Sequence, residues 1–414
     1  MKLRARLRPA IPAFAAALLA ATAFCPVARA QTPPVSAQEA KVVEGDIRAW
    51  LAAQIGAAVD VAALPLKVIA VADNYQLEVP LSGPMAGGAV TLDGGAMSVR
   101  VKQLDDHRWA IEDVHVPSPM TLGVDKTLQD ASKEGFSGVR FSIAQQEAHG
   151  VLDTSLATTS SFDAKLGGYE MVVDGKQGPQ TTRIGSVTSH LAWQPTADGL
   201  LTMTGQSNVE GYKASTMMPD GSKLAVDIAR MHGSLTAKSV AMADIGMMIH
   251  TVALLVASVR DAKAADHTGD KTDAPKPPGV PEADRANAKA LVQALAGLMG
   301  SFSNDATYED IKVDIGGQTG SLRKLAIGFD MAAPKGRADL AWRIALDGLE
   351  SPLIPEGVDR DYLPRHLALT PHIGGIPKQE LVDVVLHAID DPDAVDNMMS
   401  VMMELSLQAP LRLG

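Results

Sequence analysis

The sequence predicts an α+β fold in which a long, twisted antiparallel sheet carries helices packed on one face. Two observations predict it. Apolar and polar residues alternate in many short runs separated by turn signals. Two apolar segments of helical length interrupt these runs. Cysteine occurs once, so no disulfide framework holds the chain. A chain of 414 residues can bury a core large enough to fold without one.

The first 30 residues are typical of a secretory signal peptide. Four basic residues precede an Ala/Leu-rich segment, and Ala28-Arg29-Ala30 provides the small residues that signal peptidase requires. We expect cleavage after Ala30 and a periplasmic or secreted bacterial protein; the alternative is an uncleaved N-terminal anchor. Cys25, the only cysteine, leaves with the signal.

The mature chain is strongly acidic. Residues 1–30 hold five of the 37 basic side chains and no acidic one, which leaves 32 basic against 48 acidic side chains and a net charge of −16. Nucleic-acid binding requires a basic surface that releases counterions, so nucleic acid is excluded as a partner. The same reasoning disfavours anionic membrane surfaces.

A helix is predicted over 39–56, with Val43, Ile47, Trp50 and Leu51 at helical spacing and Gly56 at its end. Strands follow, because the apolar period changes to two. The alternating positions are Leu66, Val68, Ala70, Tyr75, Leu77, Val79, Val90, Leu92, Met97, Val99, Val101, Trp109, Ile111, Val139, Phe141, Ile143, Leu224, Val226 and Ile228. Turn signals at Asp73-Asn74, SGPMAGG, DGG and LDDH separate the runs.

The segment Asp244–Arg260 holds 15 residues without a formal charge between its ends. As a helix it is about 22 Å long, shorter than the roughly 30 Å hydrocarbon layer, so we expect a buried helix and no transmembrane span after signal cleavage. A charged, Pro-rich linker follows at 261–282, then a second amphipathic helix at Arg285–Phe302. Both helices are expected on the concave face of the sheet.

Strands return at 311–315, 325–329 and 340–346, and two helices, 377–389 and 391–407, end the chain. The predicted organisation is therefore a signal peptide (1–30), an N-terminal β-rich unit (31–260), a flexible linker (261–282) and a C-terminal α+β unit (283–414). Whether the two β regions form one sheet, and whether Gly414 is the true C-terminus, stays open.

Two segments echo each other, LAWQPTADGL at 191–200 and LAWRIALDGL at 340–349. Both resemble a strand that runs into a turn. A duplicated β unit on either side of the helices would produce this echo, and so would chance.

Motifs for nucleotide binding, metal ligation and nucleophilic catalysis are missing, so no cofactor, no metal and no catalytic residue is expected. Ser321-Leu322-Arg323-Lys324 matches S-x-x-K, but the serine enters a predicted strand rather than a helix. His366 and His372 are too far apart for a metal pair unless their loop folds back. Paired methionines instead favour an adaptable apolar core or a groove for apolar ligands.

The candidate ligand groove lies where the two apolar helices face the sheet. Its predicted lining is Met247, Met248, His250, Leu254, Leu255, Leu295, Leu298 and Met299. His250 serves either as a core histidine bonded to a backbone carbonyl or as a polar contact for a ligand's head group.

The mature chain resembles the YdgA-like periplasmic proteins of bacteria. The segments on which this resemblance rests are the signal peptide, NYQLEVPLSGP (74–84), DHRWAIEDVHVPSP (106–119), the two LAW strands and SPLIPEGVDRDYLPRHLALT (351–370). The resemblance implies an exported, β-rich, elongated protein and offers no catalytic residue. More remotely, the chain is similar to envelope proteins that carry lipid along a curved sheet.

These observations predict a non-enzymatic envelope protein that binds a lipid or other apolar ligand, or assists envelope assembly. One alternative is a periplasmic hydrolase whose site assembles from residues distant in sequence. Another is a structural partner of an envelope complex, with an apolar surface patch and no pocket.

Overall fold

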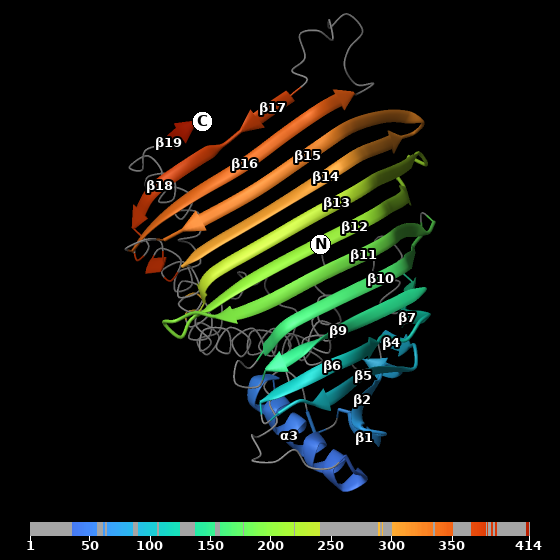
Figure 1. The fold of residues 1–414 in the computed structure, drawn as a ribbon. Coiled ribbons are helices and arrows are strands. Elements are labelled where there is room, and N and C mark those ends of the chain that lie inside the picture. Colours follow the sequence, from blue (N-terminus) through green and yellow to red (C-terminus); the bar gives the residue numbers. More distant parts are fainter. Residues whose placement is uncertain are drawn as a thin grey trace, which may run out of the picture.

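The computed structural model describes residues 35–55, 61–62, 64–85, 90–105, 107–124, 137–153, 158–176, 178–218, 220–240, 289, 292, 300–333, 336–350, 366–377, 379, 382–383, 386 and 411–413. Its strands form one large antiparallel sheet (Figure 1). The predicted β-rich antiparallel architecture is therefore confirmed. The predicted packing of helices on one face of the sheet is not confirmed, because Asp244–Arg260 lies outside the described residues.

The strands in chain order fall into short and long ones. The short N-terminal strands are β1 (Lys67–Val71), β2 (Asn74–Pro80), β3 (Gly83–Met85), β4 (Val90–Asp93), β5 (Ala96–Gln103), β6 (Arg108–His115), β7 (Met120–Val124), β8 (Gly138–Ser142) and β9 (Gln145–Asp153). The long strands are β10 (Thr158–Asp174), β11 (Gln180–Pro195), β12 (Leu201–Met217), β13 (Lys223–Val240), β14 (Ser301–Ile315), β15 (Gln318–Ala332) and β16 (Arg337–Glu350). Three short strands end the sheet: β17 (His366–Leu369), β18 (Pro371–Pro377) and β19 (Leu411–Leu413).

Two branches of short strands meet at β10. Its first half pairs with β9, and that branch continues through β6, β5 and β2 to β1. Its second half pairs with β8, and that branch continues through β7 and β4 to β3. On its other edge β10 begins the series of long strands, β11 to β16, each paired antiparallel with the next.

The two predicted β regions form a single sheet. β13 lies before the predicted linker in sequence and β14 after it, yet the two strands pair along their lengths, from Leu224–Ile315 to Lys238–Ser301. The linker itself, 261–282, lies outside the described residues.

The short strands and one helix enclose the main core. α3 (Ala37–Ile55) is capped by the preceding Ser36, whose Oγ accepts a hydrogen bond from the Glu39 backbone N–H at 3.1 Å. Of its predicted apolar stripe, Val43, Ile47 and Leu51 are buried against the alternating residues of β1, β2, β5, β6 and β9, and the Trp50 side chain lies outside the described part. Every side chain of this core group is buried: Ala40, Val43, Ile47, Leu51, Leu66, Val68, Tyr75, Leu77, Met97, Val99, Val101, Trp109, Ile111 and Leu152.

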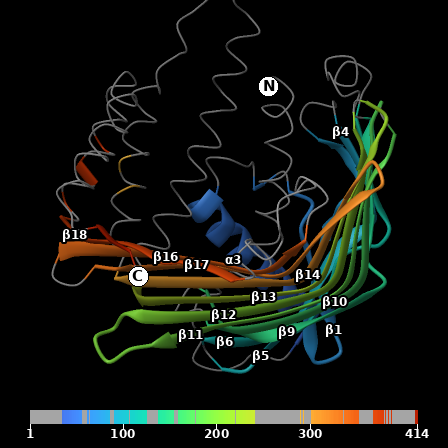
Figure 2. The same cartoon turned by 90° about the horizontal axis from the view of Figure 1, so that it is seen from above.

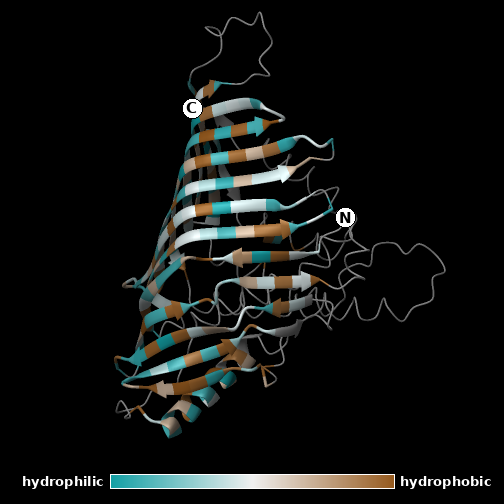
Figure 3. Cartoon of the chain, turned by 90° about the vertical axis from the view of Figure 1, so that its right-hand side faces the viewer, coloured by the Kyte–Doolittle hydropathy of each residue, from teal (hydrophilic) through white to brown (hydrophobic). Residues whose placement is uncertain are grey.

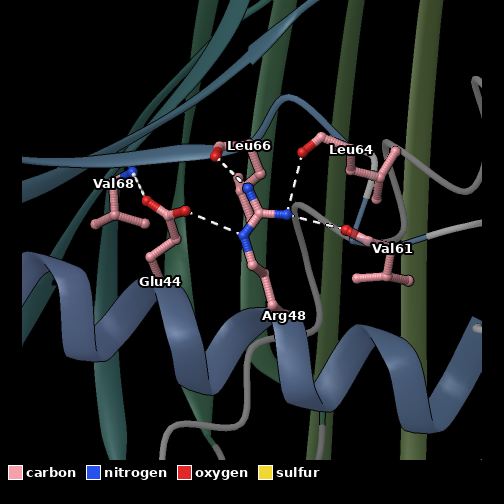
Figure 4. Close-up of polar contacts among 6 residues, drawn as sticks. All are labelled: Glu44, Arg48, Val61, Leu64, Leu66 and Val68. Carbon is pink, nitrogen blue, oxygen red and sulfur yellow. Dashed lines mark hydrogen bonds and ion pairs between the residues drawn. The ribbon is translucent and has the colours of Figure 1, made fainter.

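Arg48 fastens α3 to the chain that leads into β1 (Figure 4). Its guanidinium donates to the backbone carbonyls of Val61 (2.9 Å), Leu64 (3.1 Å) and Leu66 (2.7 Å), and to the Glu44 carboxylate at 3.0 Å. The other Glu44 oxygen accepts the Val68 N–H at 3.3 Å. One planar side chain thus satisfies three carbonyls outside any regular element.

The long strands bend sharply at one line that crosses the sheet, and α3 lies on the concave side (Figure 2). At this line the regular pairing skips one residue on each strand from β10 to β16, and the register is the same on both sides; between β11 and β12, Ile184 and Tyr212 are skipped as well. The residues skipped in all of these pairings, here called the bend residues, are Gly168, Gly185, Gly211, Ala229, Asp310, Arg323 and Gly348. Those on alternate strands have positive φ: Gly168 (61°), Gly211 (66°), Asp310 (54°) and Gly348 (66°). A residue in this left-handed conformation interrupts the pleat and bends a strand, and such residues aligned across neighbouring strands bend the whole sheet.

Several predicted details are wrong. Ser301 and Phe302 open β14, so the second predicted helix cannot extend to Phe302; within it, Lys289 and Val292 are helical. Pro377 ends β18 rather than beginning a helix. The LAW segments are not equivalent, because 191–200 runs from β11 into a turn whereas 340–349 lies inside β16.

Candidate apolar binding face

The long strands present one face that carries no charge. Phe162 of β10 packs against the core beneath α3, so the register identifies the concave face of each neighbouring strand. Three rows of side chains cross the sheet on this face. The row nearest the bend, here called the first row, is Leu166, Val187, Val209, Met231, Tyr308, Leu325, Leu346 and Leu367. The row next to it, farther from the bend, is Ala164, Ser189, Ser207, Gly233, Ala306, Ile327, Ile344 and Leu369. The row farthest from the bend, here called the third row, is Phe162, Leu191, Gly205, Leu235, Asn304, Phe329 and Trp342.

A further row lies beyond the bend. It consists of Tyr169, Ile184, Tyr212, Ile228, Ile311, Leu322 and Leu349. We call it the second row, because it borders the bend on the side opposite the first row. Arg323, a bend residue, donates to Asp347 at 2.6 Å on the polar side of the sheet. Arg323 therefore lies on the polar face, as do the ion pairs beyond the bend, Arg183 with Glu170 and Lys213 with Asp227, while the second row lies on the apolar face. We call these four rows the apolar face.

The opposite face collects the charged side chains of the long strands. Cross-strand ion pairs join Arg183 to Glu170, Lys213 to Asp227, and Arg230 to Glu309, while Arg343 contacts both Asp305 and Asp330. Figure 3 shows the resulting alternation of hydrophilic and hydrophobic residues along the strands. The chain therefore separates charge from apolar surface across one layer of backbone.

Much of the apolar face is accessible. Ile327 is 43 % exposed, Leu369 48 % and Leu349 55 %, whereas the core side chains under α3 are buried. Within the part of the chain that the structure describes, every side chain of the first and second rows is half-buried or exposed. Exposed apolar surface of this extent is typical of interaction surfaces.

Aromatic residues cluster on the apolar face away from the bend. Phe329 contacts Phe302 and Trp342, with ring centroids 6.1 and 5.5 Å apart. A small core adjoins them, in which Trp193 and Phe302 pack against buried Leu201. Near the bend, burial raises the pKa of Tyr169, so this phenol stays neutral and adds no charge to the face.

The predicted groove residues cannot be compared with this surface. Met247, Met248, His250, Leu254, Leu255, Leu295, Leu298 and Met299 all lie outside the described residues. What sequence reasoning missed is the sheet side of the site between β10 and β12. The sequence does contain a signal for this part of the site. Successive apolar residues are three positions apart at Leu166 and Tyr169, and again at Val209 and Tyr212, whereas a regular strand spaces them two apart.

The polar face offers smaller features. A shallow depression of about 150 Å³ lies near the bend, lined by Asn208, Val209, Glu210, Arg230, Met231, His232, Thr307 and Glu309. His190 shares a 2.7 Å hydrogen bond with Asp163. Over the described ranges, no group of three or more His, Asp or Glu side chains is arranged to hold a metal ion.

The sequence motifs weighed for catalysis are separated in space. Ser321 lies in β15, as its sequence context predicts, and its hydroxyl donates to Glu350 at 3.4 Å. His366 lies opposite Asp347 of β16 and His372 opposite Ala341, six residues away, so the two histidines do not pair.

No described helix is long and apolar enough to cross a membrane. Neither a protein-family model nor a curated protein nor a solved structure matches this chain.

Proposed function

We propose that this is an exported envelope protein that binds the acyl chains of a lipid on its apolar face. The observation that carries the proposal is the uncharged set of rows from β10 to β17, set against a polar face that holds the ion pairs. Burial of apolar surface is the main driving force available to a face without charges or metal ligands. An acyl chain is the ligand that such a face recognises.

The signal-peptide pattern of residues 1–30 supports an envelope location, where lipids are abundant. The predicted helices at 244–260 and 285–300 supply the second wall of the site in this proposal. They would place Met247, Leu254, Leu255 and Leu298 opposite the sheet. The resemblance to YdgA-like periplasmic proteins stays a prediction.

Native mass spectrometry of the protein purified from the periplasm tests the proposal, followed by organic extraction. We expect a chain that begins at Gln31 and carries stoichiometric lipid. Val187→Glu should abolish the bound lipid, because it places a charge in the first row. Thr188→Glu is the matched control, since it adds the same charge one residue away on the polar face. An apo mass for the unaltered protein, or equal loss in both variants, would contradict acyl-chain binding.

The second wall is tested by Leu255→Asp, with Ala264→Asp in the predicted linker as control. A carboxylate on a buried helix should lower the free energy of unfolding by several kcal/mol, about 3 or more, in a urea titration. The linker variant should stay within about 0.5 kcal/mol of the parent. Equal stability of the two variants would refute packing of this segment.

A structural partner in an envelope complex is the second candidate. The observation that favours it is the exposure of Ile344, Leu367 and Leu369 near the C-terminal end of the sheet. Chemical cross-linking in cells distinguishes this candidate from lipid binding. A specific protein cross-linked through these strands, together with a native mass without lipid, would mean that the apolar face binds a protein rather than a lipid.

A further inference from the structure

The first and second rows face each other across the bend. Figure 2 shows that the sheet bends toward the side on which α3 lies. The two rows border the bend on that concave side, one before it and one beyond it, so we infer that the bend turns their side chains toward each other. From β10 to β16 every member of both rows is Leu, Ile, Val, Met or Tyr. Seven strands at about 4.8 Å spacing make these paired rows about 29 Å long. No other pair of rows on the apolar face is uniformly large and apolar.

The composition along the strands is less uniform. On β12 the concave side chains before the bend are Met203, Gly205, Ser207 and Val209, so small and polar residues interrupt the surface in that direction. The row that contains Ala164, Ser189 and Gly233 is likewise small from β10 to β14, and becomes large and apolar only at Ile327 and Ile344. Continuous contact for a linear apolar ligand is therefore available across the strands, at the bend.

We infer that one acyl chain of the ligand lies across the strands along the inner side of the bend, between the first and second rows. This inference rests on the proposed function and adds the position and direction of the chain. It also adds a specificity. Because neither row contains a charged side chain, the two rows bind the acyl chain and do not discriminate between lipid head groups.

The direction is tested with two photoreactive palmitates on the full mature protein, one carrying a diazirine near the carboxyl end and one near the methyl end. Peptide mapping by mass spectrometry then locates each label. We expect both labels on first-row and second-row residues such as Val209, Met231 and Ile311, but on different strands. Both labels on the same strand, or labels confined to the third row near Trp342, would overturn the inference and leave lipid binding standing.

The specificity is tested by competition against the same photolabel with lysophospholipids below their micelle concentrations. Palmitoyl lysophosphatidylcholine and palmitoyl lysophosphatidylglycerol should compete within about threefold of each other. Each methylene removed from the chain should weaken competition about fourfold, the usual effect of one buried CH₂. A tenfold preference for one head group would overturn the inference. Absence of labelling by either palmitate would instead refute the proposed function itself.

Discussion

Arg48 is the residue on which the attachment of α3 to the sheet depends most. Its guanidinium donates to the carbonyls of Val61, Leu64 and Leu66 and to Glu44, and its side chain is 26 % exposed. In Arg48→Met the carbonyls of Leu64 and Leu66 lose this donor, and the Val61 carbonyl keeps only the Leu64 N–H at 3.3 Å. We expect the free energy of unfolding to fall by about 2 kcal/mol, since hydrogen bonds to a charged group contribute more than neutral ones but this group is partly solvated.

A urea titration measures the change as a shift of the midpoint at constant slope. The control is Arg183→Met, because Arg183 is 65 % exposed and pairs with Glu170 alone. Exposed ion pairs contribute little, so this variant should lose less than about 0.5 kcal/mol. If Arg183→Met destabilised the protein as much as Arg48→Met, the network around α3 would have no special role.

At the scale of elements, the bend depends on residues that tolerate positive φ. Gly211 has φ 66° and no atom closer than 3.6 Å to the position of an added Cβ, so Gly211→Ala tests backbone conformation without a clash. We expect a loss of about 1 kcal/mol in the free energy of unfolding, the usual penalty of a left-handed L-residue. Gly205→Ala on the same strand is the control, since its Cβ would make ordinary contacts. Equal stability of the two variants in thermal unfolding would argue against the bend as described.

The bend also helps to explain why some strands could be predicted from the sequence and others could not. β1, β2, β5 and β6 bury one face under α3 and expose the other, so their alternation was predicted correctly and its apolar members form the core. β10, β11 and β12 carry Ser, Thr and Gly on both faces, which weakens the contrast. In addition, each bend residue shifts the apolar period by one, so a strict period of two fails inside these strands.

The candidate site divides in the same way. Alternation predicted the apolar residues of β14, β15 and β16, including Ile311, Leu325 and Trp342, which lie on the apolar face. Sequence alone cannot place them beside Leu166 or Val187, because strand order is set by pairing between residues far apart in the chain. The bend is likewise visible only when several strands are aligned.

At the scale of the molecule, the sheet joins parts of the chain that the sequence separates. The described residues of 35–240 and those of 300–377 meet at the β13–β14 pairing, and one small core, made by Leu201, Ala237, Trp193 and Phe302, spans the same junction. An isolated C-terminal half would present the whole length of β14 as an unpaired edge, which favours aggregation.

This continuity predicts the outcome of cutting the chain within 261–282. We expect that a protease site inserted there, once cleaved, leaves two fragments that co-elute on size exclusion and separate only in denaturant, because the ladder from Leu224 to Lys238 persists. The insertion left uncleaved is the control for the loop change. The melting temperature of the cleaved protein should fall, since the fragments become independent in the unfolded state and gain entropy there. Fragments that part in buffer and each melt cooperatively would mean that the two halves are autonomous domains, and that the pairing of β13 with β14 adds little to the stability of either.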